Sequence, residues 1–434
     1  MSRLFLALLI LTLPSRAEVS FKSQVAPILL QKCVTCHGPD KAKSAYRLDT
    51  YSALMKAGDS EKPTIISGSP GESHLFQLIT TTDEDDRMPQ KAERLSDAEI
   101  LAIREWIAAG AKFDGSAKDQ SLAMLVPYQP GPEAPAHYPF PQPVLALAWS
   151  GNGKTLASSG YHEALLWDAG GKLTRRVNHL PERIHGLAFT ADNQLAIAAG
   201  APGKSGEVLI VNLNSTEPPM LLARMPDVAV SLAVNRDRTR LAAGGADNAI
   251  HVFELPGGKE LFSIQQHADW VTALCFSPDG TKLASASRDR TARLFDASNG
   301  NLLESYVEHT QPLFAVAFAA DGKKIFSGGR GKKVHAWQAE EAKKAGEFPN
   351  LEGDILALCV DQIRLFAAGG EKNIREFNAD SRKQSRVLSG HADWVYSLAL
   401  HAPTDRLASG SYDGEIRIWD AGKGELISAF KAAP

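Results

Sequence analysis

The stretch HADWVTALCFSPDGTKLASASRDRTARLFD, residues 267–296, decides the fold of most of this chain. It contains an apolar strand (VTALCFS), a turn at PDG, a small-residue strand (KLASAS), a second turn and an aromatic-ended strand (TARLFD). Short runs of this kind, separated by Gly, Pro and Asp, are typical of antiparallel strands joined by tight turns. Residues 391–420, HADWVYSLALHAPTDRLASGSYDGEIRIWD, repeat the same order.

The aromatic-ended strand marks a repeat of the whole unit. Such endings recur at steps of 40 to 44 residues, at Trp167-Asp168, Val211-Asn212, Phe253-Glu254, Phe295-Asp296, Trp337-Gln338, Phe377-Asn378 and Trp419-Asp420. A period near 42 residues with four strands per unit predicts a β-propeller. We therefore expect an all-β propeller of seven blades over residues 141–434. The outer strand that closes the ring is either GELISAF at 424–430 or a strand from residues 124–129.

These units resemble the WD-repeat family over residues 141–430. The resemblance implies that a His of each unit bonds with an Asp in a turn, a Ser in a strand and the Trp. In the last unit these positions are His391, Ser409, Asp413 and Trp419, and we expect a structural role for them. Further histidines fall at multiples of the repeat, at His179, His267 and His309.

Two tryptophans in the HADWV motifs, Trp270 and Trp394, are candidates for a partner site. The WD-repeat resemblance implies a position near the top rim, where exposed aromatic rings suit protein recognition. The alternative is packing against a neighbouring blade. The chain has no Ser-His-Asp motif, phosphate loop or paired carboxylates in a catalytic context, so we expect no catalytic residues and no enzymatic activity of the propeller itself.

A different motif, KCVTCHGPDK at residues 32–41, contains Cys33, Cys36 and His37. Structural zinc needs four ligands, and this region offers two Cys with His37 and His74. A redox dithiol favours a βαβ context, which is absent, and a simple disulfide leaves His37 unexplained. Haem c accounts for all three residues, with two thioether bonds and an axial imidazole. We therefore predict one covalently attached haem c, with His37 as an iron ligand.

The residues around this motif predict a small helical domain. FKSQVAPILLQKCVTCHG, residues 21–38, places apolar residues on one helix face, and a short apolar helix is expected at His74–Ile79. In LSDAEILAIREWIAAGAKF, Ser96 and Glu99 form a capping box, and Gly110 is a plausible stop. Two such helices joined by loops can enclose a flat apolar disc.

The sixth iron position has two candidates. Met88, in DDRMPQ, lies in a loop before the last helix and is followed by Pro89, which stiffens the backbone. A thioether ligand raises the reduction potential relative to two imidazoles. His74 is the alternative ligand, and a role in loop packing is the other interpretation of His74.

Residues 21–114 resemble the small c-type cytochrome domain known from planctomycete and related bacterial proteins. The resemblance rests on CVTCHG, YRLDT, IISGSPGESHLFQLI, RMPQ and the final LSDAEILAIREWIAAGAKF. It implies haem c at Cys33 and Cys36, His37 as proximal ligand and Met88 as distal ligand. The family usually has a Gly pair before RLD, where this chain has Ser44-Ala45-Tyr46. Arg47 is expected to pair either with a haem propionate or with a surface carboxylate.

The N-terminus, MSRLFLALLILTLPSRA, has the pattern of a signal peptide over residues 1–17, with Arg3, an apolar run and Ala17 at the expected cleavage site. We therefore expect a periplasmic or otherwise extracytoplasmic protein. A cytochrome domain is expected over 18–115 and a Pro-rich linker over 116–140. The formal net charge of −3 argues against a nucleic-acid partner. No later segment is apolar enough to span a membrane.

Together these observations predict an exported monohaem cytochrome that transfers electrons while its propeller docks a protein partner. The acidic run Asp83–Asp86, beside Met88, is expected to steer a basic redox partner. Two alternatives stay open: a haem-dependent oxidoreductase with the propeller as substrate platform, and a surface interaction module with haem as a sensor.

Overall fold

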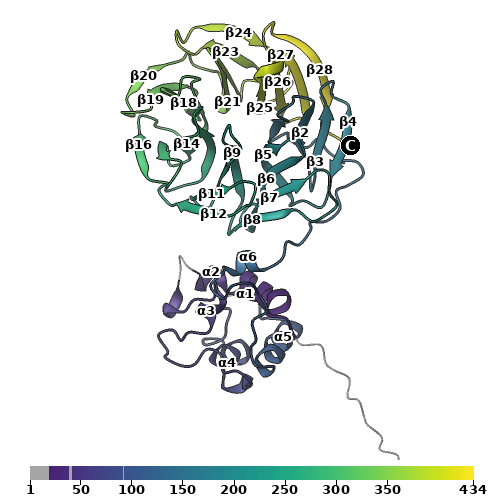
Figure 1. Cartoon of the computed structure of the whole chain (residues 1–434), viewed down its shortest axis with the longest axis vertical. Helices are drawn as coiled ribbons and strands as arrows, with labels where there is room; N and C mark the ends of the chain where they lie inside the picture. The colour runs from purple at the N-terminus through teal and green to yellow at the C-terminus, as the bar shows by residue number, and fades with distance from the viewer. Residues whose placement is uncertain (1–18, 39–41, 91) are drawn as a thin grey trace, which may run out of the picture. The chain divides into compact units, whose positions relative to one another are not determined.

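The computed structural model describes residues 19–38, 42–90 and 92–434, which form two compact units, residues 1–127 and 128–434 (Figure 1). The signal peptide expected at 1–17 lies outside the described residues. The expected linker, 116–140, is divided between the units, because residues up to Pro127 belong to the first and those from Tyr128 to the second.

The first unit is helical, as the sequence predicts. Its described helical segments are η1 Phe21–Val25, α1 Ala26–Lys32, α2 Val34–His37, η2 Lys43–Ala45, α3 Tyr51–Leu54, η3 Pro70–Glu72, α4 His74–Thr80, α5 Asp97–Ala108 and α6 Leu122–Leu125. The expected capping box starts α5: the Ser96 amide donates to Glu99 Oε2 at 2.7 Å, and the Glu99 amide donates to Ser96 Oγ at 3.3 Å. Past the end of α5, Gly110 has φ +97°, a left-handed conformation that suits glycine.

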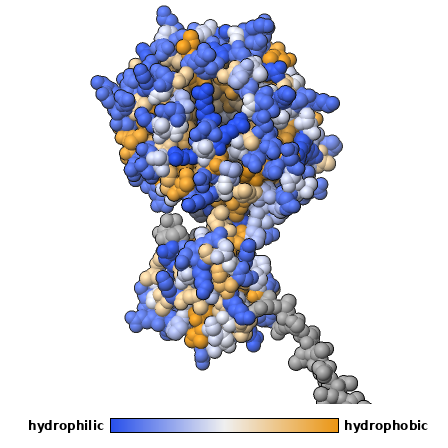
Figure 2. Space-filling model, viewed as in Figure 1, coloured by the Kyte–Doolittle hydropathy of each residue, from blue (hydrophilic) through white to orange (hydrophobic). Residues whose placement is uncertain are grey.

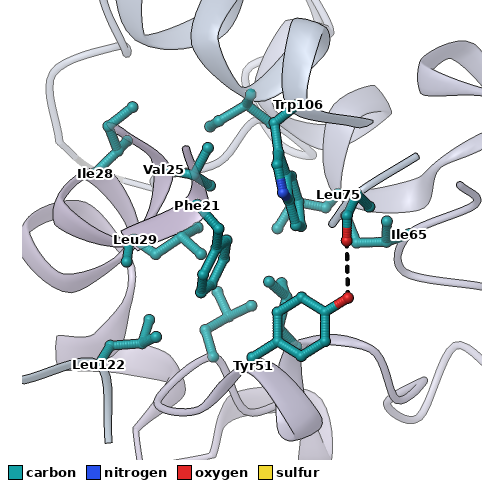
Figure 3. Close-up of a cluster of buried hydrophobic side chains, with 14 of the residues drawn as sticks. Phe21, Val25, Ile28, Leu29, Tyr51, Ile65, Leu75, Trp106 and Leu122 are labelled. Carbon is teal, nitrogen blue, oxygen red and sulfur yellow. Dashed lines mark hydrogen bonds between the residues drawn. The ribbon is translucent and has the colours of Figure 1, made fainter. Parts of the chain in front are cut away.

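Aromatic rings join the two ends of this unit in one core (Figure 3). The Phe21 ring centroid lies 5.1 Å from that of Trp106 and 5.2 Å from that of Tyr51. The polar atoms of the Tyr51 and Trp106 side chains are both hydrogen-bonded. Tyr51 Oη donates to the Ala111 carbonyl and Trp106 Nε1 donates to the Lys112 carbonyl, each at 2.8 Å. The N-terminal helices and α5 are thereby fixed against each other.

Part of the expected spacer belongs to the same core. Leu122, Leu125 and Val126 are all buried in it. The α6 turn starts after Ser121, which forms an isolated antiparallel β-bridge with Thr50, and the Leu122 amide donates to the Asp49 carbonyl at 2.7 Å. Residues 122–126 are therefore a packed extension of the helical unit.

The second unit is a β-propeller of seven four-stranded antiparallel sheets, each made of four consecutive strands, which confirms the predicted fold (Figure 1). The first four sheets contain β1 Leu147–Trp149, β2 Thr155–Ser159, β3 Ala164–Asp168, β4 Leu173–Val177, β5 Arg183–Ala191, β6 Gln194–Ala201, β7 Ser205–Asn212, β8 Met220–Met225, β9 Ala229–Val234, β10 Arg240–Gly245, β11 Ile250–Glu254, β12 Glu260–Ile264, β13 Val271–Phe276, β14 Lys282–Ser287, β15 Ala292–Asp296 and β16 Leu302–Tyr306. The other three contain β17 Leu313–Phe318, β18 Lys324–Gly329, β19 His335–Gln338, β20 Lys344–Glu347, β21 Ile355–Asp361, β22 Arg364–Gly369, β23 Ile374–Asn378, β24 Gln384–Leu388, β25 Val395–His401, β26 Arg406–Ser411, β27 Glu415–Asp420 and β28 Glu425–Lys431.

The first strand of each sheet faces the axis of the ring. These strands, β1, β5, β9, β13, β17, β21 and β25, contact one another in that order, and β1 contacts β25. Figure 2 shows a hollow at the axis, with hydrophobic residues inside and hydrophilic residues around its opening.

The ring closes with the C-terminal strand. β28 pairs with β27 as the outer strand of the last sheet, and residues 124–129 contribute no strand. Side chains join the first and last sheets: Ser397 Oγ donates to the Val144 carbonyl at 2.8 Å, and the rings of Trp167 and Phe430 lie 4.7 Å apart. The junction between the ends of the ring is therefore a packing contact rather than a shared sheet.

The expected histidine network is incomplete in blades four, five and seven. In blade five, His309 Nε2 lies 2.9 Å from Ser327 Oγ, which accepts from Trp337 Nε1 at 3.2 Å, and no Asp among the described residues bonds to this histidine. In the fourth blade, His267 Nδ1 lies 2.8 Å from Asp289 Oδ2 and Nε2 lies 2.7 Å from Ser285 Oγ. Phe295 takes the Trp position there and has no N–H to donate.

In the last blade the predicted bond between His391 and Asp413 is wrong. His391 Nε2 lies 2.7 Å from Ser409 Oγ, which also accepts from Trp419 Nε1 at 2.9 Å, as expected. However, His391 Nδ1 faces Glu415 Oε2 at 3.3 Å, while Asp413 Oδ2 accepts from Lys431 Nζ at 3.0 Å. The longer Glu415 side chain reaches the imidazole in place of Asp413. His179 joins no such network, because its Nδ1 lies 3.1 Å from the Gly131 carbonyl.

Replacing the network aspartate should therefore cost more in blade four than in blade seven. Asp289 accepts bonds from His267, the Ala268 amide and Thr291, and Asp289→Asn leaves buried donors unmatched, at about 1–3 kcal/mol. Asp413→Asn mainly weakens an exposed ion pair with Lys431, at about 0–1 kcal/mol. Urea unfolding of both variants measures the difference, and equal losses would contradict this account.

The histidine pair of blade five should make the propeller less stable in acid. The His309 and His335 rings stack with centroids 4.0 Å apart, and His335 Nε2 lies 3.6 Å from Glu347 Oε1. Burial, then the charges of His335 and Lys344, lower the pKa of His309 from 6.5 to about 3. Between these values the unfolded chain binds more protons than the folded one, so stability falls as the pH drops below 6.5.

Between pH 6.5 and pH 5, we expect His309→Gln to lose about 2 kcal/mol less stability than the wild type. Thermal unfolding across that pH range measures the difference. His251 provides a control of opposite sign. Burial lowers its pKa, but hydrogen bonds to Asp247 and Glu260 outweigh burial and raise it to about 9. The stability that His251 contributes to the folded protein is fully present below pH 6.5 and is lost as the pH rises through 9. An unchanged acid slope in His309→Gln would disprove the assignment.

Candidate haem-binding site

The three residues of the CxxCH motif lie within one helical turn at the junction of α1 and α2. Cys33 separates the two helices, and its carbonyl accepts hydrogen bonds from the amides of Cys36 (3.1 Å) and His37 (3.0 Å). Both cysteines are free thiols. Burial, and then the neighbouring Cys36 and Glu99, raise the pKa of Cys33 to about 12, so this thiol is neutral at physiological pH.

The His37 ring is oriented by a backbone carbonyl. Its Nδ1 lies 3.1 Å from the Tyr46 carbonyl, and the His37 carbonyl accepts from the Leu48 amide at 2.7 Å. A carbonyl can only accept, so Nδ1 carries the proton and Nε2 keeps its lone pair. Nε2 makes no hydrogen bond within the part of the chain that the structure describes. Metal-binding histidines are commonly held in this way.

The turn that presents the Tyr46 carbonyl is strained. Ser44 has φ +55° and Ala45 has φ +52°, which are left-handed conformations that favour glycine. These are the positions where the resembling family usually has a Gly pair. The chain thus keeps a glycine-type backbone without glycine, next to the carbonyl that orients His37.

Met88 is anchored beside α4 by its backbone amide, which donates to the Leu78 carbonyl at 3.0 Å. Its half-buried side chain packs against the helical core, as do those of Cys33 and Tyr46. Further half-buried apolar residues belong to the same set: Leu30, Val34, Met55, Phe76 and Ile100. The Cys33 thiol, the Tyr46 ring and the Met88 thioether are therefore each half-buried against this core.

The alternative ligand, His74, is the first residue of α4, and its amide donates to the Pro63 carbonyl at 3.1 Å. Its Nδ1 is buried without a hydrogen-bond partner in the described ranges. Loop packing alone leaves this nitrogen unsatisfied.

The structure adds a residue that sequence reasoning missed. Arg87 precedes Met88, and its Nη1 is buried with no hydrogen-bond partner among the residues described. A buried guanidinium N–H without an acceptor is costly and points to an absent anionic group. By contrast, Arg47, the earlier candidate, pairs with Asp49 at 2.7 Å. Only the RMPQ motif could have drawn attention to Arg87 in the sequence.

These donors fit haem c. The set contains two thiols for thioether bonds, an imidazole with a fixed tautomer, a thioether and a cationic donor for a propionate. In the described ranges, no group of three or more His, Cys, Asp or Glu side chains is placed to hold a metal ion.

The propeller candidates, Trp270 and Trp394, differ in exposure. Trp270 lines a pocket of about 640 Å³, with the guanidinium of Arg288 over its ring at 4.6 Å. Trp394 is 43% exposed, and its ring lies 6.4 Å from that of Tyr396. Both rings are therefore available, at least in part, at the surface.

Comparison with protein families agrees with both units. Residues 33–91 match the family described as Planctomycete cytochrome C. Residues 258–296, 300–338 and 382–420 match the WD domain, G-beta repeat. The helical unit thus resembles planctomycete cytochromes c and the seven-bladed propeller resembles WD-repeat proteins, so both predicted resemblances are confirmed.

Curated relatives match only short parts of the chain. THO complex subunit 6 of Homo sapiens is 33% identical over 69 residues, 16% of this chain and 20% of that protein. The probable E3 ubiquitin ligase complex SCF subunit sconB of Arthroderma benhamiae is 42% identical over 48 residues, 11% and 7% of the two chains. The target of rapamycin complex subunit wat1 of Schizosaccharomyces pombe is 26% identical over 90 residues, 20% and 29% of the two chains. The chain spans about a fifth of the length of the first of these.

The resemblance to cytochrome and WD-repeat families indicates a haem-binding domain joined to a protein-interaction scaffold. In the described part of the chain, no helix is both long and apolar enough to cross a membrane.

Proposed function

We propose that this chain is an exported monohaem cytochrome c that transfers electrons while its propeller docks a protein partner. The observation that carries the proposal is the His37 ring, whose Nδ1 is held by the Tyr46 carbonyl and whose Nε2 is left without a hydrogen bond among the described residues. Cys33 and Cys36 would attach the haem, and His37 and Met88 would bind its iron. When bound, the haem supplies one-electron exchange between ferric and ferrous iron.

The surrounding residues tune and hold this group. The Tyr46 carbonyl fixes the proton on His37 Nδ1 and increases the basicity of Nε2. The Met88 thioether raises the reduction potential relative to a second imidazole. Arg87 supplies an N–H donor for a propionate carboxylate. The packing of Phe21 on Trp106 keeps the helix that carries the cysteines in place.

Export and partner choice are further parts of the proposal. The pattern of residues 1–17 supports a periplasmic or other extracytoplasmic location. Asp83–Asp86 are all exposed and would steer a basic redox partner, so the rate of electron exchange should fall as salt is added. The partial relatives are named as subunits of complexes, which supports a docking role for the propeller.

The test is optical and electrochemical. The full chain is produced with a haem-attachment system, and we expect haem to stay on the denatured chain and to titrate reversibly between two oxidation states. Absence of covalent haem would overturn the proposal. A wild-type spectrum that is already high-spin would replace electron transfer with ligand sensing or with the oxidoreductase alternative.

Arg87 offers a second test of the site. Removing a positive charge near the iron favours the ferric state, so Arg87→Gln should lower the reduction potential on the order of tens of millivolts. Arg47→Gln removes the same charge from an arginine that pairs with Asp49 and should change the potential less. Equal shifts in a redox titration of the two variants would show that Arg87 has no special relation to the haem.

A further inference from the structure

A pocket of about 640 Å³ lies on the axis of the propeller. All seven sheets or the segments beside them contribute lining residues, including Leu145, Ile184, Val230, Thr272, Phe314 and Leu356. A site lined by every blade is a single site of the whole ring.

The pocket is strongly cationic. Arg183, Arg288 and Arg330 line it, whereas no Asp or Glu is among its lining residues, all of which the structure describes. Arg183 lies 3.9 Å from Glu182, and Arg288 lies 3.8 Å from Asp269, both long separations for ion pairs. These two arginines are 58% and 42% exposed in their side chains, so water screens even these contacts.

Arg330 is the least compensated of the three. It is exposed, and its guanidinium makes no hydrogen bond or ion pair with any residue in the ranges described. His185 adds an unsatisfied group to the same lining, because its Nε2 is buried without a hydrogen-bond partner there. Burial, and then the nearby Arg183, lower the pKa of His185 to about 4, so it is neutral at physiological pH.

Three aromatic side chains of the seventh blade, Tyr412, Tyr396 and Trp394, lie next to one another and extend from the pocket. The rings of Tyr396 and Tyr412, which line the pocket, lie 5.9 Å apart, and the Trp394 ring lies 6.4 Å from Tyr396. Tyr412 is 52% exposed and Trp394 is 43% exposed. The apolar surface therefore continues beyond the cavity, which suits an extended chain better than a compact small molecule.

We propose that this axial pocket binds an acidic peptide segment of a partner protein, with Asp or Glu carboxylates on Arg183, Arg288 and Arg330 and the adjoining chain along Trp394 and Tyr412. Arginine forms strong, directional bonds with carboxylates, and the absence of lining acids gives the pocket the complementary charge. The inference deepens the docking role of the proposed function, and it does not require the haem.

Binding is tested on the full chain with a short fluorescent glutamate peptide that ends in a tyrosine, and with the matching glutamine peptide. Fluorescence anisotropy should show binding of the glutamate peptide, weakening with added salt, and none of the glutamine peptide. Arg330→Gln should weaken binding about tenfold, and substitution of all three arginines should abolish it. Arg236→Gln removes the same charge from an exposed arginine outside the pocket and should have no effect.

Binding that survives the triple substitution, or that Arg236→Gln weakens equally, would overturn the proposal. Trp394→Ala separates a peptide from a small anion: it should weaken the peptide and leave competition by citrate unchanged. If citrate displaces the peptide and Trp394→Ala has no effect, the pocket is a small-anion site. Thermal unfolding of each variant checks the fold, and its haem spectrum reports the cytochrome separately. Loss of haem with intact peptide binding would overturn the proposed function alone.

Discussion

Haem-loaded Met88→Ala is expected to lose the low-spin spectrum of the native protein and to show a lower reduction potential. The haem itself should remain on the denatured chain, because the thioether bonds proposed at Cys33 and Cys36 do not involve Met88. The effect should be complete rather than partial, since alanine offers no ligand atom. The Met88 side chain is half-buried against the helical core, so its truncation also leaves a gap in that packing.

His74→Ala is the matched control for the axial ligand. The proposed assignment requires this variant to keep the low-spin spectrum in both oxidation states. If His74→Ala changes the spin state and Met88→Ala does not, His74 is the ligand. The Nδ1 atom of His74 is buried without a hydrogen-bond partner among the described residues. Absorption and magnetic circular dichroism spectra of the two variants distinguish these outcomes.

Trp106→Ala should destabilise the helical unit by about 3–5 kcal/mol, a large part of the roughly 5–15 kcal/mol that stabilises a typical domain. Trp106 is 1% exposed, packs on Phe21 and Tyr51, and donates from Nε1 to the Lys112 carbonyl. Its removal leaves a cavity between the two ends of the unit and removes the hydrogen bond to the Lys112 carbonyl. Guanidinium unfolding followed by the helical circular dichroism signal measures the loss.

Leu101→Ala is the control on the same helix. Leu101 is 47% exposed, so its truncation removes little buried surface and should cost well under 1 kcal/mol. A similar loss in both variants would mean that Trp106 does not link the two ends of the unit. Intrinsic fluorescence should show the propeller transition unchanged in either variant.

Repeated or strictly local features could be predicted from the sequence. The recurring strand endings gave the seven sheets because each blade is formed by four consecutive strands. The start of α5 was predictable because Ser96 and Glu99 are only three residues apart. The helix that leads into Cys33 followed from apolar spacing alone.

Contacts between distant, non-repeated residues could not be predicted. The Glu163 carboxylate is fully buried, where it accepts bonds from Tyr138 at 2.6 Å and Arg176 at 2.6 Å. These contacts fix the segment expected as linker to the first blade, but no spacing rule connects their positions. The choice of Glu415 over Asp413 beside His391 likewise depends on side-chain reach, which a family pattern does not reveal.

The way the ring closes has a consequence for how the propeller folds. Each sheet pairs strands that are adjacent in sequence, so no blade needs a strand from the other end of the chain to be complete. Pairing over short sequence separations lowers contact order, and in repeat proteins folding can start at one repeat and spread to its neighbours. The slow, long-range step is confined to docking blade seven on blade one, where Trp149 Nε1 meets the Ala399 carbonyl at 3.2 Å. Substitutions at this junction should therefore delay the last phase of refolding and leave the earlier blades unaffected.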